Sequence, residues 1–99
     1  MSERLNLTYT SAVILEAIAE RHTYGFDIID STGLPSGTVY PALRRMEAAG
    51  LIKSGWDREA AGSSAGPPRK YYRLTSGGRK HLGVLRDRYP RLAQASKTK

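Results

Sequence analysis

The side chains best suited to chemistry lie between positions 36 and 45, where hydroxyl groups occur at every second position and two arginines follow. Arginine donates paired hydrogen bonds to guanine, and hydroxyls donate to phosphate oxygens or base edges. At 100° per residue, the face opposite an apolar stripe of Val39, Leu43 and Met46 collects small, polar and basic residues. This face, its flanks and the start of the helix comprise Ser36, Gly37, Thr38, Tyr40, Pro41, Arg44 and Arg45. We predict that they contact double-stranded DNA.

Three residues outside this segment are further candidates for phosphate contact. Arg69 and Lys70 follow a run of Ala, Gly, Ser and Pro, and two adjacent cations there suit a phosphate backbone of any sequence. Tyr24 precedes a short apolar segment, where it either packs at a helix start or donates its hydroxyl to a phosphate. From the residues alone, both alternatives stay open for Tyr24.

The sequence lacks the patterns of a catalytic or metal-binding protein. It has no Cys, and His22 and His81 are isolated, so a metal site is not expected. Asp27 and Asp30 lie three apart and could act as an acid and a base, but no nucleophile or oxyanion-binding pattern accompanies them. No phosphate-binding loop or nucleophile elbow occurs. We expect neither an enzyme nor a bound cofactor.

The composition indicates one small, strongly basic domain. The chain has 99 residues, of which 39% are hydrophobic, enough for one modest core and too few for a multidomain enzyme. Its net charge of +7 favours an anionic partner, with nucleic acid as the first candidate. Residues 1–68 contain six Lys and Arg against eight acids, whereas residues 69–99 contain ten against one. The bulk attraction for phosphate is therefore expected from the last third of the chain.

No membrane or secretory segment is expected. The longest mainly apolar run, residues 12–19, is shorter than the roughly 20 residues that cross a bilayer. The first ten residues carry charges of both signs and no apolar stretch of signal-peptide length. Because the chain has no Cys, it suits a reducing compartment, and we expect a cytoplasmic protein.

Three helices are expected in the first half of the chain. Thr10 or Ser11 can cap a first helix that is apolar nearly all round, as a central buried helix would be. A short second helix is expected to end at Gly33. A third helix, capped by Ser36, is expected to run to about Ala49.

A hairpin and a last helix are expected in the second half. Segments beginning at Leu51 and Arg69 are rich in aromatic and β-branched residues, which predicts two strands. Residues 58–68 between them are rich in Ala, Gly and Ser and predict a mobile hairpin tip. Thr75 can cap a last helix that Pro90 should end, with a frayed polar tail after it.

The last helix carries an apolar stripe at spacings of three, four and three residues. The stripe consists of Leu82, Leu85, Tyr89 and Leu92. One chain of this size cannot easily cover it, so the stripe predicts a two-fold dimer. The fold class expected from the order of elements is mainly α with a small β-hairpin. It comprises a winged helix-turn-helix domain over residues 1–75, then a C-terminal dimerisation helix and polar tail over residues 76–99.

Three segments of the chain resemble the PadR family of bacterial transcriptional regulators. They are TYGFDII, SGTVYPALRRMEAAGLIKSGWD and GPPRKYYRLTSGGRKHL, and the resemblance extends from about Ser11 to Leu82. The short chain, with one helix after the hairpin, is similar to the compact subfamily. The resemblance implies a homodimer on a pseudo-palindromic operator, usually a repressor relieved by a small ligand. It also implies that the start of the third helix approaches DNA and that Tyr24 contacts a phosphate.

The position of the single tryptophan departs from part of this subfamily. Some compact members place a tryptophan on the last helix, where it stacks flat drugs across the dimer. Here Trp56 lies on the first hairpin strand, where we expect it to cover the edge of the core. This departure argues against the planar-drug mode but leaves room for another ligand between the subunits.

Other functions are compatible with the charge and the expected fold. They are an RNA-binding protein, a helix-turn-helix module that binds protein, and a general drug- or flavin-binding dimer. The exposed aromatic pairs and Gly-rich clamps of common RNA modules are absent from the sequence. We therefore predict a sequence-specific regulator that binds double-stranded DNA, acting as a ligand-responsive homodimeric repressor on an inverted-repeat operator.

Overall fold

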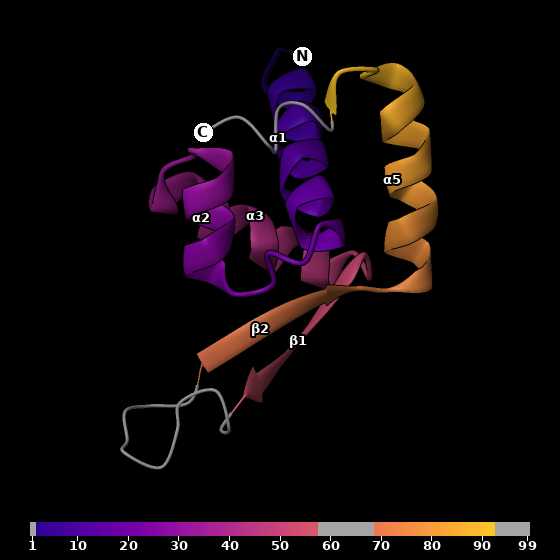
Figure 1. Cartoon of the computed structure of the whole chain (residues 1–99). Helices are drawn as coiled ribbons and strands as arrows, with labels where there is room; N and C mark the ends of the chain where they lie inside the picture. The colour runs from indigo at the N-terminus through magenta and orange to yellow at the C-terminus, as the bar shows by residue number, and fades with distance from the viewer. Residues whose placement is uncertain (1, 58–68, 93–99) are drawn as a thin grey trace.

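The chain forms a group of helices from which a β-hairpin projects (Figure 1). The computed structural model describes residues 2–57 and 69–92, with side chains from Tyr9 onward. The predicted mobile hairpin tip, residues 58–68, and the polar tail after residue 92 lie outside the described residues. The elements run in the order α1 (Ser2–Ala19), α2 (Gly25–Thr32), α3 (Ser36–Ala48), β1 (Ile52–Asp57), β2 (Arg69–Leu74) and α5 (Ser76–Arg88). The predicted fold class, mainly helical with a small hairpin, is confirmed.

Helix α1 is the central helix, as its all-round apolar sequence predicts. Residues 12–18 are buried, and α1 packs against α2, α3, β2 and α5. The predicted start at Thr10 or Ser11 is wrong, because the helix begins at Ser2. No glycine or proline interrupts residues 2–19, so the backbone continues as a helix past both potential caps.

The carboxylate of Glu16 lies inside this core. Glu16 is 1% exposed, and its two carboxylate oxygens accept hydrogen bonds from the guanidinium of Arg86 on α5, at 2.8 and 3.0 Å. A buried charge requires such a partner, because burying it alone costs several kcal/mol. The same hydrogen bonding raises the pKa of Arg86. This ion pair connects α5 to α1.

Left-handed residues follow the ends of α1, α2 and α3. Gly33 (φ 75°) ends α2 and Gly50 (φ 81°) follows α3. After α1 the left-handed residue is Arg21 (φ 77°), in a turn where the amide of His22 donates to the carbonyl of Ala17 at 3.0 Å. A residue other than glycine costs about 1 kcal/mol in this conformation. Arg21 therefore occupies a position where glycine would be the more stable residue.

Helix α3 has its predicted apolar stripe but not its predicted cap. Val39, Leu43 and Met46 are buried in the core. The helix begins at Ser36, and Pro35 is its N-cap without a side-chain hydrogen bond, so the predicted Ser36 cap is wrong. The ring of Pro35 fixes its φ at −68°, a value compatible with the extended backbone of a cap position, and Ser36 begins the first helical turn.

The two faces of the hairpin have different neighbours. Strands β1 and β2 pair antiparallel, with Ile52 opposite Leu74, and successive residues alternate between the faces. The hydroxyl of Ser54 donates to Glu47 of α3 at 2.7 Å, so one face is turned toward α3. This α3 face carries Ile52, Ser54, Trp56, Lys70 and Tyr72. The opposite face, turned toward the end of α1, carries Lys53, Gly55, Asp57, Arg69, Tyr71 and Arg73 and is called the α1 face.

The outer edge of β2 is covered by the segment between α1 and α2. The amide of Tyr72 donates to the carbonyl of Thr23 at 2.7 Å, and Tyr24 forms an antiparallel bridge with Tyr71. These bonds satisfy backbone groups that an edge strand would otherwise leave open. They also place Tyr24 beside the hairpin.

Helix α5 begins at its predicted cap and ends before Pro90. Oγ1 of Thr75 accepts a hydrogen bond from the amide of Gly78 at 3.0 Å. The last helical residue is Arg88, followed by Tyr89 as the C-cap. Both ends therefore agree with the local signals in the sequence.

The apolar stripe of α5 lies in the core of its own chain. Leu82, Leu85 and Leu92 are 1–2% exposed, and Tyr89 packs edge-on against Tyr9 of α1, with ring centroids 5.1 Å apart. The expectation that one chain cannot cover this stripe is wrong. Helix α1 covers this stripe, since it packs against α5, with Glu16 paired to Arg86 beside Leu85 and Tyr9 against Tyr89 (Figure 1). A charge at Leu85 would therefore disturb the fold itself.

Candidate nucleic-acid interface

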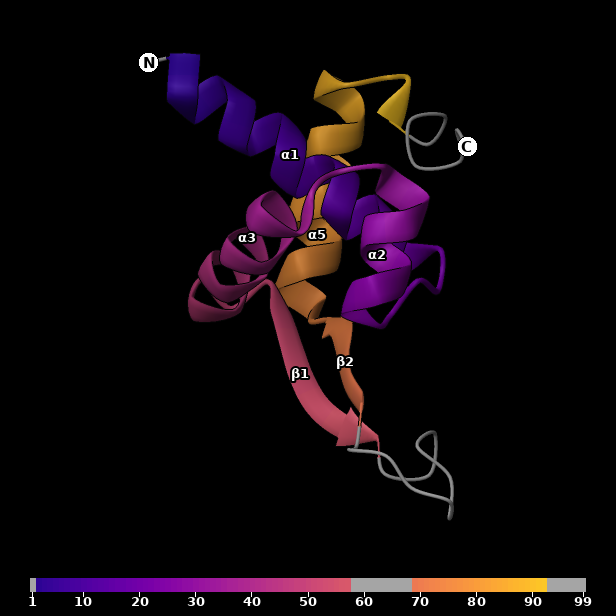
Figure 2. The same cartoon turned by 90° about the vertical axis from the view of Figure 1, so that its left-hand side faces the viewer.

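Helix α3 presents a basic face to solvent, opposite its buried stripe. Arg44 and Arg45 are both exposed there, and Figure 2 looks onto α3 and α2 with α5 behind them. The helix continues through Pro41, whose missing amide donor removes one backbone hydrogen bond. Of the other predicted contact residues, Ser36 and Gly37 are exposed, and Thr38 and Pro41 are half-buried. The structure thus gathers the predicted residues of α3 on one accessible surface.

Tyr40 links this surface to the start of α2. A Cβ atom at Gly25 would come within 2.8 Å of the Tyr40 ring and hydroxyl, so the ring lies directly against the glycine backbone. The side chain is nevertheless 39% exposed. Tyr40 therefore packs between two helices and stays accessible to a partner.

The α3 face of the hairpin extends the basic surface of α3. Burial raises the pKa of Tyr72, and Tyr40 and Arg44 lie close enough to act on that pKa as well. Further along the same face, Nζ of Lys70 lies 5.7 Å from the ring centroid of Trp56. Lys70 is exposed, as a phosphate contact requires. This face therefore adds one of the two predicted hairpin cations to the surface of α3.

Trp56 contradicts its expected role. It is 62% exposed and does not cover the edge of the core. Period-two alternation correctly places it on the same face as Ile52, but the hairpin projects beyond the helices, so nothing in the described residues covers the outer end of that face (Figure 1). Sequence reasoning thus missed an exposed indole beside Lys70 as a candidate contact. The sequence could have indicated this exposure, because Trp56 lies opposite Lys70 and close to residues 58–68, which have no apolar anchor.

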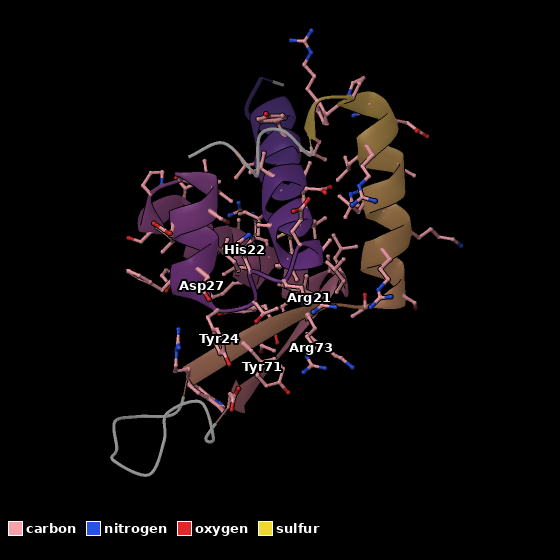
Figure 3. All side chains as sticks on the ribbon, viewed as in Figure 1. Arg21, His22, Tyr24, Asp27, Tyr71 and Arg73 are labelled. Atoms are coloured by element: carbon pink, nitrogen blue, oxygen red, sulfur yellow. The ribbon has the colours of Figure 1, made fainter. Side chains whose placement is uncertain are left out.

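Tyr24 and Arg69 lie on the other side of the hairpin. The Tyr24 hydroxyl donates to Oδ2 of Asp57 at 2.6 Å, and this hydrogen bond raises the pKa of Tyr24. The guanidinium of Arg69 lies 4.1 Å from the centroid of the Tyr24 ring. Figure 3 shows Tyr24 beside Tyr71 on the viewer's side of the hairpin. The predicted phosphate contacts are therefore divided between two faces, with Lys70 on the α3 face and Tyr24 and Arg69 on the α1 face.

Substituting Lys70 with alanine is expected to weaken binding to duplex DNA of every sequence by a similar factor. Because a lysine that neutralises one phosphate releases about one counterion, the slope of log affinity against log salt should become shallower by about one. Mobility-shift titrations at several salt concentrations measure both effects. Lys80→Ala, which removes an exposed lysine of α5, is the matched control. A Lys70→Ala loss confined to one DNA sequence would contradict this assignment.

Neither a membrane span nor a metal centre emerges from the described residues. None of their helices combines the length and the apolar character needed to cross a bilayer. Their His, Asp and Glu side chains form no group of three that could hold a metal ion. The basic surface of α3 and the hairpin is therefore the best-developed candidate site in this part of the chain.

The fold has close counterparts among solved structures. A PadR-like transcription factor from Bacteroides fragilis matches with a TM-score of 0.76 and 28% identity, covering 94% of this chain and 91% of the other. A PadR family regulator from Clostridium difficile R20291 matches with a TM-score of 0.66 and 32% identity, over 85% and 91% of the two chains. A PadR family regulator from Eggerthella lenta DSM 2243 matches with a TM-score of 0.63 and 31% identity, covering 94% of this chain and 84% of the other. No curated protein matches the chain significantly.

The sequence also matches a family model across most of its length. Residues 14–84 match the transcriptional regulator PadR-like family, a span that contains α2, α3, both strands, the last third of α1 and most of α5. Family, solved counterparts and fold agree on a winged helix. DNA binding is implied by this membership, and catalysis is not a property of the family. The chain is a member of the PadR-like family of transcriptional regulators.

Proposed function

We propose that this regulator is a homodimeric, effector-responsive repressor that binds an inverted-repeat operator. The observation that carries the proposal is the exposed arginine face of α3, held outward by the burial of Val39, Leu43 and Met46 on the opposite side. A helix with one side fixed in the core and arginines on the other suits the major groove, where arginine distinguishes guanine from other bases.

The contacts to DNA are proposed to divide by role. Arg44 and Arg45 contact base edges, while Ser36, Thr38 and Tyr40 contact phosphates or base edges near the start of α3. Gly37 and Pro41 leave the helix surface small enough for close approach. Lys70 contacts the phosphate backbone, and Arg69 reaches it from the other side of the hairpin. Tyr24 contacts a phosphate there by exchanging its hydroxyl hydrogen bond to Asp57 for one to the phosphate. Bases thus set the sequence preference, and the hairpin cations set affinity.

A second copy of the chain is proposed to pack on the outer side of α5. The residues first predicted at this interface, Leu82, Leu85, Tyr89 and Leu92, support α5 from its inner side. Val84 lies on the outer side and is 58% exposed, with Gly83 beside it in open space. A small residue beside an apolar one allows two helices to approach closely. To bind two half-sites one helical turn apart, such a dimer must hold its two copies of α3 about 34 Å apart.

Val84→Glu is expected to convert the dimer to a folded monomer, because it places a charge in the proposed contact without entering the core. Sedimentation velocity reports the mass, and circular dichroism reports the fold. The monomer should lose affinity for a duplex with two half-sites and keep its affinity for one half-site. Leu85→Glu is the contrasting variant and should unfold instead. A Val84→Glu protein that remains fully dimeric would place the interface elsewhere.

Effector control, the remaining part of the proposal, needs a ligand that binds one arrangement of the dimer better than the other. Such a ligand would change the separation of the two α3 helices and so the affinity for both half-sites together. Selection of bound fragments from random DNA, followed by titration of the selected duplex, tests the operator prediction. Selected fragments without an inverted repeat would contradict it.

A further inference from the structure

A second basic surface lies on the side of the hairpin that faces away from α3. A groove of about 980 Å³ opens between the α1 face of the hairpin, the end of α1 and α5. Within the described part of the chain, one acid, Asp57, lines this groove together with the cations Arg21, Lys53, Arg73, Arg79 and Arg86. Ile18, Leu74 and Leu82 contribute an apolar part of the wall. The groove therefore combines a strong positive charge with apolar surface.

Within the described residues, the cations that line the groove outnumber the acids in or beside it. Arg86 is paired with Glu16, and Glu20 also acts on its pKa. Asp57 accepts the hydroxyl hydrogen bond of Tyr24. The remaining cations come from separate segments: Arg21 after α1, Lys53 on β1, Arg73 on β2 and Arg79 on α5. Converging cations repel one another unless an anion lies among them.

Arg21 supplies an independent sign that the groove is functional. Its left-handed backbone favours glycine, yet the residue there is a long cation that lines the groove. Figure 3 shows Arg21 and Arg73 on the same side of the molecule, with Tyr71 beside them. The guanidinium of Arg73 lies 5.0 Å from the Tyr71 ring centroid, which fixes its direction. Local strain of this kind is characteristic of binding sites.

The hairpin separates this groove from the proposed base-contacting surface. Ser54 and Tyr72 on the α3 face adjoin α3, whereas Lys53 and Arg73 point to the opposite face. A duplex docked on α3 therefore approaches the opposite side of the hairpin from Lys53 and Arg73, and of the proposed DNA contacts only Tyr24 also lines the groove. Residues of α1 and α5 both line the groove. A molecule bound there would therefore contact the two helices that the Glu16–Arg86 ion pair connects.

We propose that this groove binds a small organic anion with two or more negative charges, such as a di- or tricarboxylate or a phosphate ester. Arg21, Arg73 and Arg79 hold its charged groups, and the apolar wall accepts its carbon skeleton. Binding of the anion does not depend on the proposed function. An effect of the bound anion on the dimer, and through the dimer on DNA affinity, does rest on the proposed function, because α5 lines the groove and also carries the proposed dimer contact.

The test uses the full chain and the fluorescent trisulfonate dye pyranine as the probe, with citrate and inorganic pyrophosphate as competitors. Fluorescence anisotropy is expected to show saturable binding that Arg21→Gly and Arg79→Gln each weaken about tenfold, the loss of one charge-assisted contact. Arg88→Gln removes an exposed arginine of α5 outside the groove and should change the affinity less than twofold. Displacement by citrate or by pyrophosphate distinguishes carboxylate from phosphate ligands.

Two further measurements show whether a loss of dye binding arises at the groove or from a change in stability or in general affinity for anions. Thermal unfolding of Arg21→Gly should occur at the same or a higher temperature than in the parent, because glycine relieves the left-handed strain. Its affinity for a random-sequence duplex should stay within twofold. The proposal is overturned if Arg88→Gln weakens dye binding as much as Arg21→Gly, if neither groove variant weakens it, or if Arg21→Gly weakens DNA and dye equally.

Discussion

Replacing Arg44 with alanine is expected to weaken binding to the operator by about 1 to 3 kcal/mol, with a much smaller loss on random DNA. Arg44 is exposed on the side of α3 opposite Leu43 and Met46, so its removal leaves the core intact. The free energy at stake is large because a guanidinium can donate two hydrogen bonds to one guanine, and the alanine variant leaves those acceptors unpaired. Base preference at one position of each half-site should relax as well.

Mobility-shift titrations on the selected operator and on a scrambled duplex measure this difference. Arg88→Ala is the matched control, because it removes the same charge from an exposed position on α5. Unfolding temperatures of both variants should equal that of the parent. If Arg44→Ala lowered the affinities for operator and scrambled duplex by the same factor, Arg44 would contact phosphate and the base contacts would have to come from other residues.

Local signals in the sequence predicted the boundaries of most elements. Gly33 and Gly50 adopt the left-handed conformation that ends a helix, and Thr75 caps α5 through the amide of Gly78. These features depend on interactions within about four residues, so the sequence contains them directly. The outward direction of Arg44 was predictable for the same reason, since it depends only on the helical period.

Features that depend on how a neighbouring element packs were not predictable in the same way. Trp56 has the strand period of a buried residue, but α3 does not reach the outer end of the hairpin to cover it. Leu85 has the spacing of a dimer stripe, but α1 of the same chain packs against α5 and Leu85 is buried within the chain. Both errors arise because periodicity identifies the apolar side of an element without identifying what covers that side.

The groove between the hairpin and α5 shows a further limit of sequence reasoning. Its cations are spread from Arg21 to Arg86 and share no motif. The left-handed backbone of Arg21 is also invisible in the sequence, because arginine gives no sign of a turn that glycine usually makes. Only the tertiary arrangement places these charges around one space.

Gly78→Ala is expected to destabilise the fold strongly, although it adds only one methyl group. A Cβ atom there would lie 1.9 Å from the carbonyl oxygen of Leu51, which is backbone and cannot rotate away. That carbonyl also accepts hydrogen bonds from the amide and hydroxyl of Thr75, at 3.0 and 3.1 Å. The start of α5 must therefore move away from Leu51, which would strain the Thr75 cap. We expect a loss of about 3 kcal/mol, a large part of the roughly 5 to 15 kcal/mol that stabilises a domain of this kind.

Gly83→Ala on the same helix is the matched control and should shift stability in the opposite direction. A Cβ atom at Gly83 meets nothing within 4 Å, and alanine favours a helix interior over glycine by about 0.5 to 1 kcal/mol. Thermal unfolding followed by circular dichroism should therefore show a midpoint lower by about 12 °C or more for Gly78→Ala and slightly higher for Gly83→Ala. A Gly78→Ala chain that fails to fold agrees with this expectation. Equal midpoints for the two variants would show that α5 is not held against Leu51. The position of α5, which lines the groove and carries the proposed dimer contact, would then have to be revised.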